Sequence, residues 1–176
     1  MRNVNTNDLL IDRAKLFEGH FGCSGTFEQG KVSFPCRENT CLLTLHSRRS
    51  IMSINHFLSL QASVGAEEEG RQAAVCYLNR FGKWSTRGRN PMMRRLCALL
   101  NSSVEVSSEL RGADLDSVVI RDTGTHITLE VNLYGGGYSV IVLPPLQFRV
   151  GLSGEQARKA ATLFTSVHTL IQEFAA

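Results

Sequence analysis

The sequence lacks any apolar run long enough to cross a bilayer. Its longest apolar stretches are interrupted by Arg, His, Asn or Ser, whereas a membrane-spanning helix needs about 20 consecutive apolar residues. The segment Met1–Phe17 also contains no extended apolar region and no small-residue cleavage site of the kind that marks a secretory signal. These absences predict a cytoplasmic protein that has no membrane partner.

Closely paired cysteines are also absent. His20 and His46 flank a region with a loosely zinc-like spacing, but zinc sites usually contain a tight Cys-x2-Cys pair. We therefore expect no metal, and we expect the cysteines to serve as small buried hydrophobic residues in a reducing cytosol. The five cysteines are Cys23, Cys36, Cys41, Cys76 and Cys97. Whether Cys23, Cys36 and Cys41 have a role beyond packing stays open.

No motif of an established catalytic class is present. The sequence at Gly22–Gly25 differs from a Gly-x-Ser-x-Gly nucleophile elbow by one position. Cys23 could form a thiolate pair with His20 or His46, but any chain with five Cys and five His offers such pairs, so the pattern does not indicate catalysis. The run Gly135–Gly137 lacks the spacing of a phosphate loop and is expected to form a hairpin between two strands. The sequence therefore predicts no catalytic residue and no cofactor, and favours a non-enzymatic role.

Length and composition are those of an ordinary globular protein. The chain has 176 residues, of which 43% are apolar and 20% are charged. Such a chain can bury a sizeable core and is not expected to be largely disordered. We predict a single domain over residues 1–176, with a subdivision near residues 82–90 as the alternative.

Periodicity and capping residues predict three helices. The first covers Asn7–Phe17, with Asn5 or Thr6 as its cap and with Gly19 and Gly22 after it. The second begins after Asn90, which is a good N-cap. Pro91 takes its first position, where a missing backbone N–H costs nothing. The third opens with the capping box Ser153-x-x-Gln156. The predicted helices are 7–17, 91–100 and one that starts at 153 and runs to the C-terminal region.

Strand signals fall into two groups. Alternation in Ile51–Ala62 favours a strand with His56 on its apolar face, although a helix with Ile51, Ile54 and Leu58 inward also fits. We predict an α+β fold: a largely antiparallel sheet with an N-terminal, a central and a C-terminal helix packed on it. The predicted strand regions are Gly25–Phe34 (a hairpin), Thr40–Ser47, Ile51–Ala62, Arg71–Phe81, Ser117–Arg121, Thr125–Tyr134, Tyr138–Leu143 and Phe148–Leu152.

One stretch lacks acidic residues altogether. Arg80–Arg95, called the basic segment below, contains six basic residues and no acidic one, which leaves 13 basic against 16 acidic residues in the rest of the chain. Such a segment, at the start of a helix whose free amides also attract anions, is a candidate anion-binding site. The six are Arg80, Lys83, Arg87, Arg89, Arg94 and Arg95.

The single tryptophan, Trp84, lies inside the basic segment and joins the candidate site. Its ring could stack on a base or cap the core. A helical wheel places Arg94 and Arg95 opposite the apolar arc of their helix, so both face solvent. The alternative is a solvated basic surface balanced by Glu67–Glu69.

Two stretches, Asn90–Asn101 and Tyr134–Gln156, resemble a small bacterial family of uncharacterised proteins. That family carries a similar Asn-Pro-x-x-Arg-Arg-Leu helix start and a Pro-Pro segment before its final helix. The resemblance implies a single domain with these elements and no assigned activity. It also implies that Asn90, Pro91 and the two following arginines serve helix entry rather than a ligand. The order of helices and strands is similar, in addition, to that of bacterial type III secretion chaperones.

Two functions follow as hypotheses. The leading one is a non-enzymatic binding module whose basic segment meets an anionic ligand, a nucleic acid or an acidic protein surface. The alternative is a homodimeric protein-interaction or secretion-chaperone-like protein that binds polypeptide. A dimer is expected because Ile51–Ala62 and Tyr138–Leu143 supply more apolar strand surface than three short helices cover.

Overall fold

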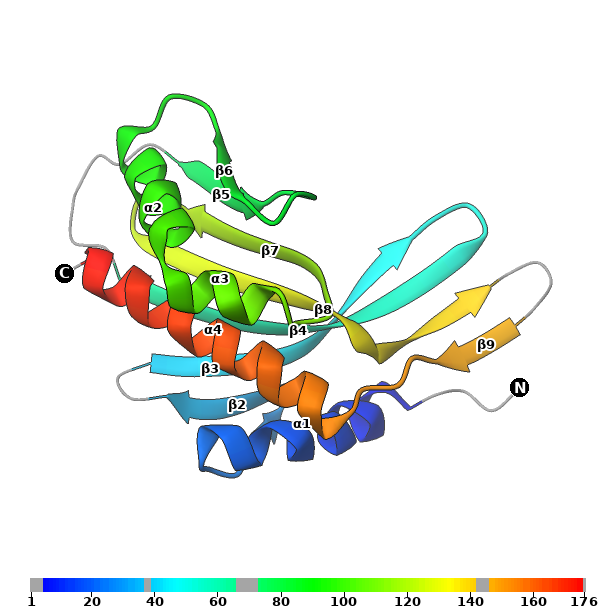
Figure 1. The fold of residues 1–176 in the computed structure, drawn as a ribbon. Coiled ribbons are helices and arrows are strands. Elements are labelled where there is room, and N and C mark those ends of the chain that lie inside the picture. The colour runs from blue at the N-terminus through cyan, green and yellow to red at the C-terminus, as the bar shows by residue number, and fades with distance from the viewer. Residues whose placement is uncertain (1–4, 37–38, 66–72, 142–145, 176) are drawn as a thin grey trace.

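The protein is a single antiparallel sheet with helices on one of its faces (Figure 1). The computed structural model describes residues 5–36, 39–65, 73–141 and 146–175, and these contain four helices and nine strands. The α+β prediction is therefore confirmed, and both predicted strand groups belong to the same sheet. The helices are α1 (Thr6–Phe21), α2 (Pro91–Ser102), α3 (Val104–Leu110) and α4 (Gly154–Ala175).

The strand order places the basic segment at one edge of the sheet. The order is β1-β2-β3-β4-β8-β7-β5-β6, and β9 pairs with the end of β8. Among the described strands, β6 therefore has a neighbour on only one side. The strands are β1 (Thr26–Glu28), β2 (Lys31–Cys36), β3 (Asn39–Arg49), β4 (Ser53–Gly65), β5 (Ala74–Leu78), β6 (Trp84–Arg87), β7 (Leu115–Asp122), β8 (His126–Ile141) and β9 (Leu146–Arg149).

Alternating side chains separate the covered face of the sheet from the open one. In β8, Ile127, Leu129, Val131 and Leu133 are buried against the helices, as the predicted alternation requires. The helix α4 lies across the sheet in Figure 1 and buries an apolar stripe that includes Phe164. The opposite face, called the open face below, carries polar side chains.

The predicted capping residues are present, but α1 runs to Phe21, four residues beyond its predicted end, and therefore includes Gly19. The side chain of Asn5 accepts a hydrogen bond from the amide of Asn7, and α1 ends at Gly22, whose φ is 68°. Asn90 accepts from the amide of Met93 at 3.1 Å and so starts α2. The Ser153 hydroxyl and the Gln156 side chain exchange bonds with each other's amides at 3.1 and 2.9 Å, which confirms the capping box.

The region Ile51–Ala62 is a strand, so the helical alternative is wrong. The strand β4 starts two residues later than expected because Ile51 and Met52 lie in the exposed turn after β3. His56 is only half-buried: its Nδ1 atom lies 2.8 Å from the Ser47 hydroxyl, and its ring stacks on Tyr138.

The predicted hairpin at Gly135–Gly137 is also wrong, because β8 is one strand of 16 residues. The glycines form a bulge in β8, and the register with β4 shifts there. A Cβ atom at Gly137 would overlap the backbone oxygen of His56, and Gly136 has a φ of 88°. Glycine is therefore required by a close approach of two backbones rather than by a turn.

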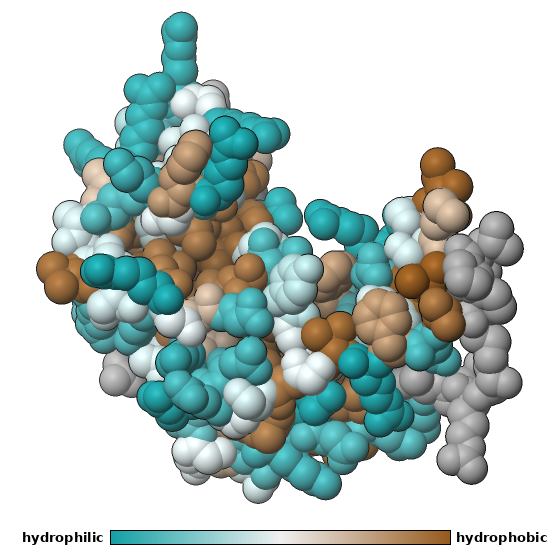
Figure 2. Space-filling view, turned by 45° about the vertical axis from the view of Figure 1, so that its right-hand side comes forward, coloured by the Kyte–Doolittle hydropathy of each residue, from teal (hydrophilic) through white to brown (hydrophobic). Residues whose placement is uncertain are grey.

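Beyond this bulge the sheet continues as a projecting arm, defined as residues 47–56 and 138–149 except the undescribed 142–145. Figure 1 shows these strand ends projecting from the rest of the sheet, and Figure 2 shows hydrophobic residues exposed on that side of the molecule. The Pro-Pro segment, Pro144 and Pro145, lies outside the described residues, as does the segment Glu67–Glu69.

Candidate anion-binding edge

The edge strand β6 is held in place by α2. The side-chain amide of Asn101 accepts a hydrogen bond from the amide of Trp84 and donates one to its carbonyl, both at 2.9 Å. These bonds occupy the outer side of the strand at Trp84, where no further strand pairs. The basic segment therefore contains a short, anchored strand.

Trp84 caps the core and offers no stacking surface. Its side chain is only 3% exposed and belongs to the main hydrophobic cluster. The indole therefore does not stack on a base, and of the two sequence-based alternatives the structural one describes it. The six basic residues of the segment, in contrast, are all exposed.

Two of the six, Arg80 and Lys83, lie in the turn between β5 and β6. The side chain of Asn79 shapes this turn by accepting hydrogen bonds from the amides of Phe81 and Lys83 at 2.9 and 3.1 Å. The guanidinium of Arg80 lies 4.8 Å from the centre of the Phe81 ring. The turn thus holds two cations beside an exposed aromatic ring.

A cavity of about 590 Å³ opens between this turn and the helices α2 and α3. Its lining combines the cations Lys83 and Arg111 with the hydrogen-bonding side chains of Asn101 and Ser107 and the ring of Phe81. Sequence reasoning missed Arg111 because the seven-residue helix α3, which ends beside it, was not predicted. The only local signal was Ser103, whose hydroxyl caps α3 by accepting from the amide of Val106 at 3.3 Å.

The other four basic residues lie toward the far end of β6. Alternation directs Arg87 to the open face, where its guanidinium lies 5.6 Å from the centre of the Tyr77 ring. Arg94 lies on the exposed side of α2 and donates a 3.4 Å hydrogen bond to the carbonyl of Gly88. Together with Arg89 and Arg95, they continue the positive charge around the edge. We call Arg111 and the six basic residues of the segment the basic edge.

The charges of the basic edge are not neutralised by neighbours in the described structure. No carboxylate among the described residues lies within 4.0 Å of any of the seven cations; the ion pairs found there are Lys15–Asp12, Arg121–Glu130 and Lys159–Glu155. The balancing segment Glu67–Glu69 lies outside the described residues. The candidate edge is therefore a line of exposed cations that have no ion-pair partner among the described residues.

The cysteines that the structure describes contribute no reactive centre to this edge. The sulfur atoms of Cys76 and Cys97 lie 2.7 Å apart where β5 meets α2. Burial raises the pKa of both thiols, so the reactive thiolate is scarce at neutral pH. Within the described ranges, no three His, Cys, Asp or Glu side chains are placed to hold a metal ion. None of the helices described there is long and apolar enough to cross a membrane.

Comparison with known proteins places the chain in one family. A family model described as "Protein of unknown function (DUF3156)" matches residues 21–171. The predicted resemblance to a small uncharacterised family is thereby confirmed. No curated protein and no solved structure matches the chain.

Proposed function

The chain belongs to the DUF3156 family of proteins of unknown function, and we propose that it is a non-enzymatic binding module whose basic edge holds a polyanionic partner. The partner class that fits this edge best is single-stranded nucleic acid. The edge needs no catalytic group for this role, because affinity comes from cations that neutralise phosphates and from rings that stack on bases.

The observation that carries the proposal is the set of seven exposed cations with no described carboxylate within 4.0 Å. Cations of this kind interact with phosphates without first breaking an internal ion pair. Each phosphate contact releases a condensed counterion, and this release drives binding at low salt.

The spread of the cations favours a polymer over a single phosphate. Lys83 directly precedes the strand β6, and Arg87 is its last residue, so four residue steps along the strand separate their backbones by about 13 Å. One phosphate cannot reach both ends, whereas consecutive phosphates of a strand can.

The aromatic side chain at the cavity favours nucleic acid over an acidic protein. Phe81 is 74% exposed and lines the cavity together with Lys83 and Arg111. Every base has a flat face that can stack on such a ring, and this stacking stabilises single-strand complexes by about 1–3 kcal/mol per base. An acidic polypeptide gains no equivalent contact.

Fluorescence anisotropy with a labelled 20-nucleotide single strand tests the proposal. Affinity should fall with added salt, with a log–log slope of about −0.7 for each phosphate neutralised. A duplex of the same sequence and a polyglutamate of equal charge are the comparison probes. Stronger binding to polyglutamate than to the single strand would indicate an acidic protein as the partner instead. No binding to any probe at low salt would contradict the proposal.

A second candidate function, self-association, is supported by the arm. Ile51 is 99% exposed and Met52 is 55% exposed at its tip, and Leu146 and Phe148 are exposed on β9. Exposed apolar groups on one projecting element are typical of an interaction surface. Light scattering at micromolar concentration should give twice the monomer mass. If Ile51→Asp leaves a dimer unchanged, the arm is not the interface.

A further inference from the structure

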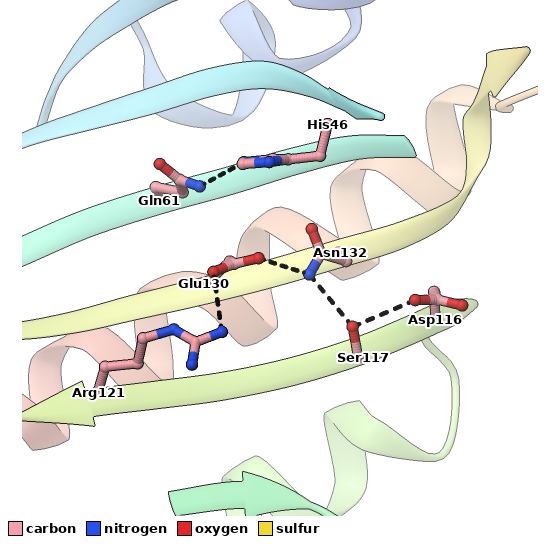
Figure 3. Close-up of polar contacts among 7 residues, drawn as sticks. All are labelled: His46, Gln61, Asp116, Ser117, Arg121, Glu130 and Asn132. Carbon is pink, nitrogen blue, oxygen red and sulfur yellow. Dashed lines mark hydrogen bonds and ion pairs between the residues drawn. The ribbon is translucent and has the colours of Figure 1, made fainter. Parts of the chain in front are cut away.

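A polar cluster occupies the open face of the sheet, away from the basic edge (Figure 3). Its central residues are directly opposite one another on neighbouring strands: Thr44 opposes Ser59, Ser59 opposes Asn132, and Asn132 opposes Ser117. These residues form a row across β3, β4, β8 and β7. Polar side chains thus run across the middle of the sheet rather than along its margin.

The amide of Asn132 is fixed by two hydrogen bonds from its nitrogen. One goes to Oε1 of Glu130 at 2.8 Å, and the other goes to the hydroxyl of Ser117 at 3.1 Å. The Ser117 hydroxyl donates in turn to Asp116 at 3.2 Å. The amide oxygen is consequently directed away from Ser117, as Figure 3 shows.

Three neighbouring polar atoms in this row are buried and lack a partner among the described residues. They are Oγ1 of Thr44, Oγ of Ser59 and Oδ1 of Asn132. A buried polar atom without a partner costs about 1–3 kcal/mol. Most buried polar atoms in proteins have a hydrogen-bond partner, so three neighbouring atoms without one on paired strands are unusual.

A cavity of about 220 Å³ lies beside this row on the open face and is lined by two of its residues, Ser117 and Asn132. Arg48 and His46 from β3 line one side of it, and Asp116 and Glu130 line the other. Phe57 supplies an apolar patch. His46 is held by Gln61, with 2.7 Å between the His46 Nε2 atom and the Gln61 amide nitrogen.

The two sides of the cavity carry opposite charges that form no ion pair with each other in the described structure. Within the described structure, Arg48 has no carboxylate and Asp116 has no cation within 4.0 Å, while Glu130 lies 3.7 Å from Arg121. An anion alone would leave Asp116 unpaired, and an amine alone would leave Arg48 unpaired. A ligand that carries both charges satisfies both sides at once.

We propose that this cavity binds a small zwitterion, namely a free amino acid or a dipeptide. Its carboxylate faces Arg48 and His46, its ammonium group faces Asp116 and the oxygen of Asn132, and its apolar part lies against Phe57. Size supports this class, because the cavity is smaller than the roughly 300–1,000 Å³ typical of pockets for drug-sized ligands.

Isothermal titration calorimetry on the full chain tests the proposal. The probes are the free amino acids, Gly-Gly and Gly-Leu, with succinate, putrescine and glucose as molecules that carry one charge sign or none. At least one zwitterion should bind with a dissociation constant below a millimolar value, more tightly than all three comparison molecules. Absence of zwitterion binding, or tighter binding of glucose, succinate or putrescine, would overturn the proposal.

Adjacent arginines on opposite faces of β3 provide a matched control. Arg48→Gln and Asp116→Asn should each weaken zwitterion binding by at least about tenfold, because each removes a charged hydrogen-bond partner. Arg49→Gln makes the same chemical change on the other face of the strand and should change affinity less than twofold. Equal effects of Arg48→Gln and Arg49→Gln, with thermal melting confirming that both variants fold, would place the ligand elsewhere.

Discussion

The side-chain amide of Asn101 pairs with both backbone polar groups of Trp84, and this relationship fixes the edge that carries the basic residues. The two bonds are each 2.9 Å long and connect α2 with β6. They hold the strand against the helix that contains Arg94 and Arg95. This amide therefore helps to fix the positions of the cations at the two ends of β6.

Replacing Asn101 with Ala should lower the free energy of unfolding by about 1–3 kcal/mol, because two backbone groups lose their partner. Urea denaturation measures this change. Ser102→Ala is the matched control, since the Ser102 hydroxyl is exposed and donates to the carbonyl of Leu99 in its own helix. If both variants unfold at the same urea concentration, Asn101 does not anchor the edge.

Local signals predicted the elements whose limits are encoded in adjacent residues. Asn90 and Pro91 start α2, and the exchange between Ser153 and Gln156 starts α4, because capping depends on residues three positions apart. The strand β8 was predicted up to Tyr134 because its buried and half-buried residues alternate. These features require no knowledge of distant parts of the chain.

The features that were missed depend on distant contacts. The glycines 135–137 form a bulge because the backbone of His56 comes against Gly137, and no local pattern distinguishes this from a hairpin. The sequence left open whether Trp84 stacks on a base or caps the core, because its burial depends on how α2 holds β6. Arg111 reaches the same cavity as Lys83 only through the placement of α3. Charge clustering thus predicted exposed cations, but not how they are arranged.

Gly137→Ala should destabilise the protein by more than about 1 kcal/mol, because the new Cβ would overlap the His56 carbonyl and the backbone must shift. Thermal or urea unfolding measures the effect. Gly19→Ala is the control: Gly19 lies within α1 with open space around it, so alanine should stabilise by roughly 0.5–1 kcal/mol. A neutral Gly137→Ala variant would contradict the close approach of β4 and β8.

Stability should fall as the pH is lowered from 7 to 5. Burial lowers the pKa of His168 below its usual value, so the folded state keeps this ring neutral while the unfolded chain takes up a proton near pH 6.5. His168→Gln should therefore reduce the pH dependence of the free energy of unfolding. Burial also lowers the pKa of His20 and His56, so part of the dependence should remain. Thr169→Ala, the neighbouring control, should keep the full dependence; an unchanged slope in His168→Gln would contradict this account.

The most direct test of the basic edge is the salt dependence of single-strand binding in two arginine-pair variants. Arg94→Gln/Arg95→Gln removes two charges from the edge, and Arg48→Gln/Arg49→Gln removes two from β3. The first pair should flatten the log–log slope by about 1.4, which corresponds to two phosphate contacts. The second pair should leave the slope within error of the wild type, and both variants should keep the wild-type melting temperature. Equal slopes in the wild type and the Arg94/Arg95 variant, or equal flattening by both pairs, would contradict a nucleic-acid site at the basic edge.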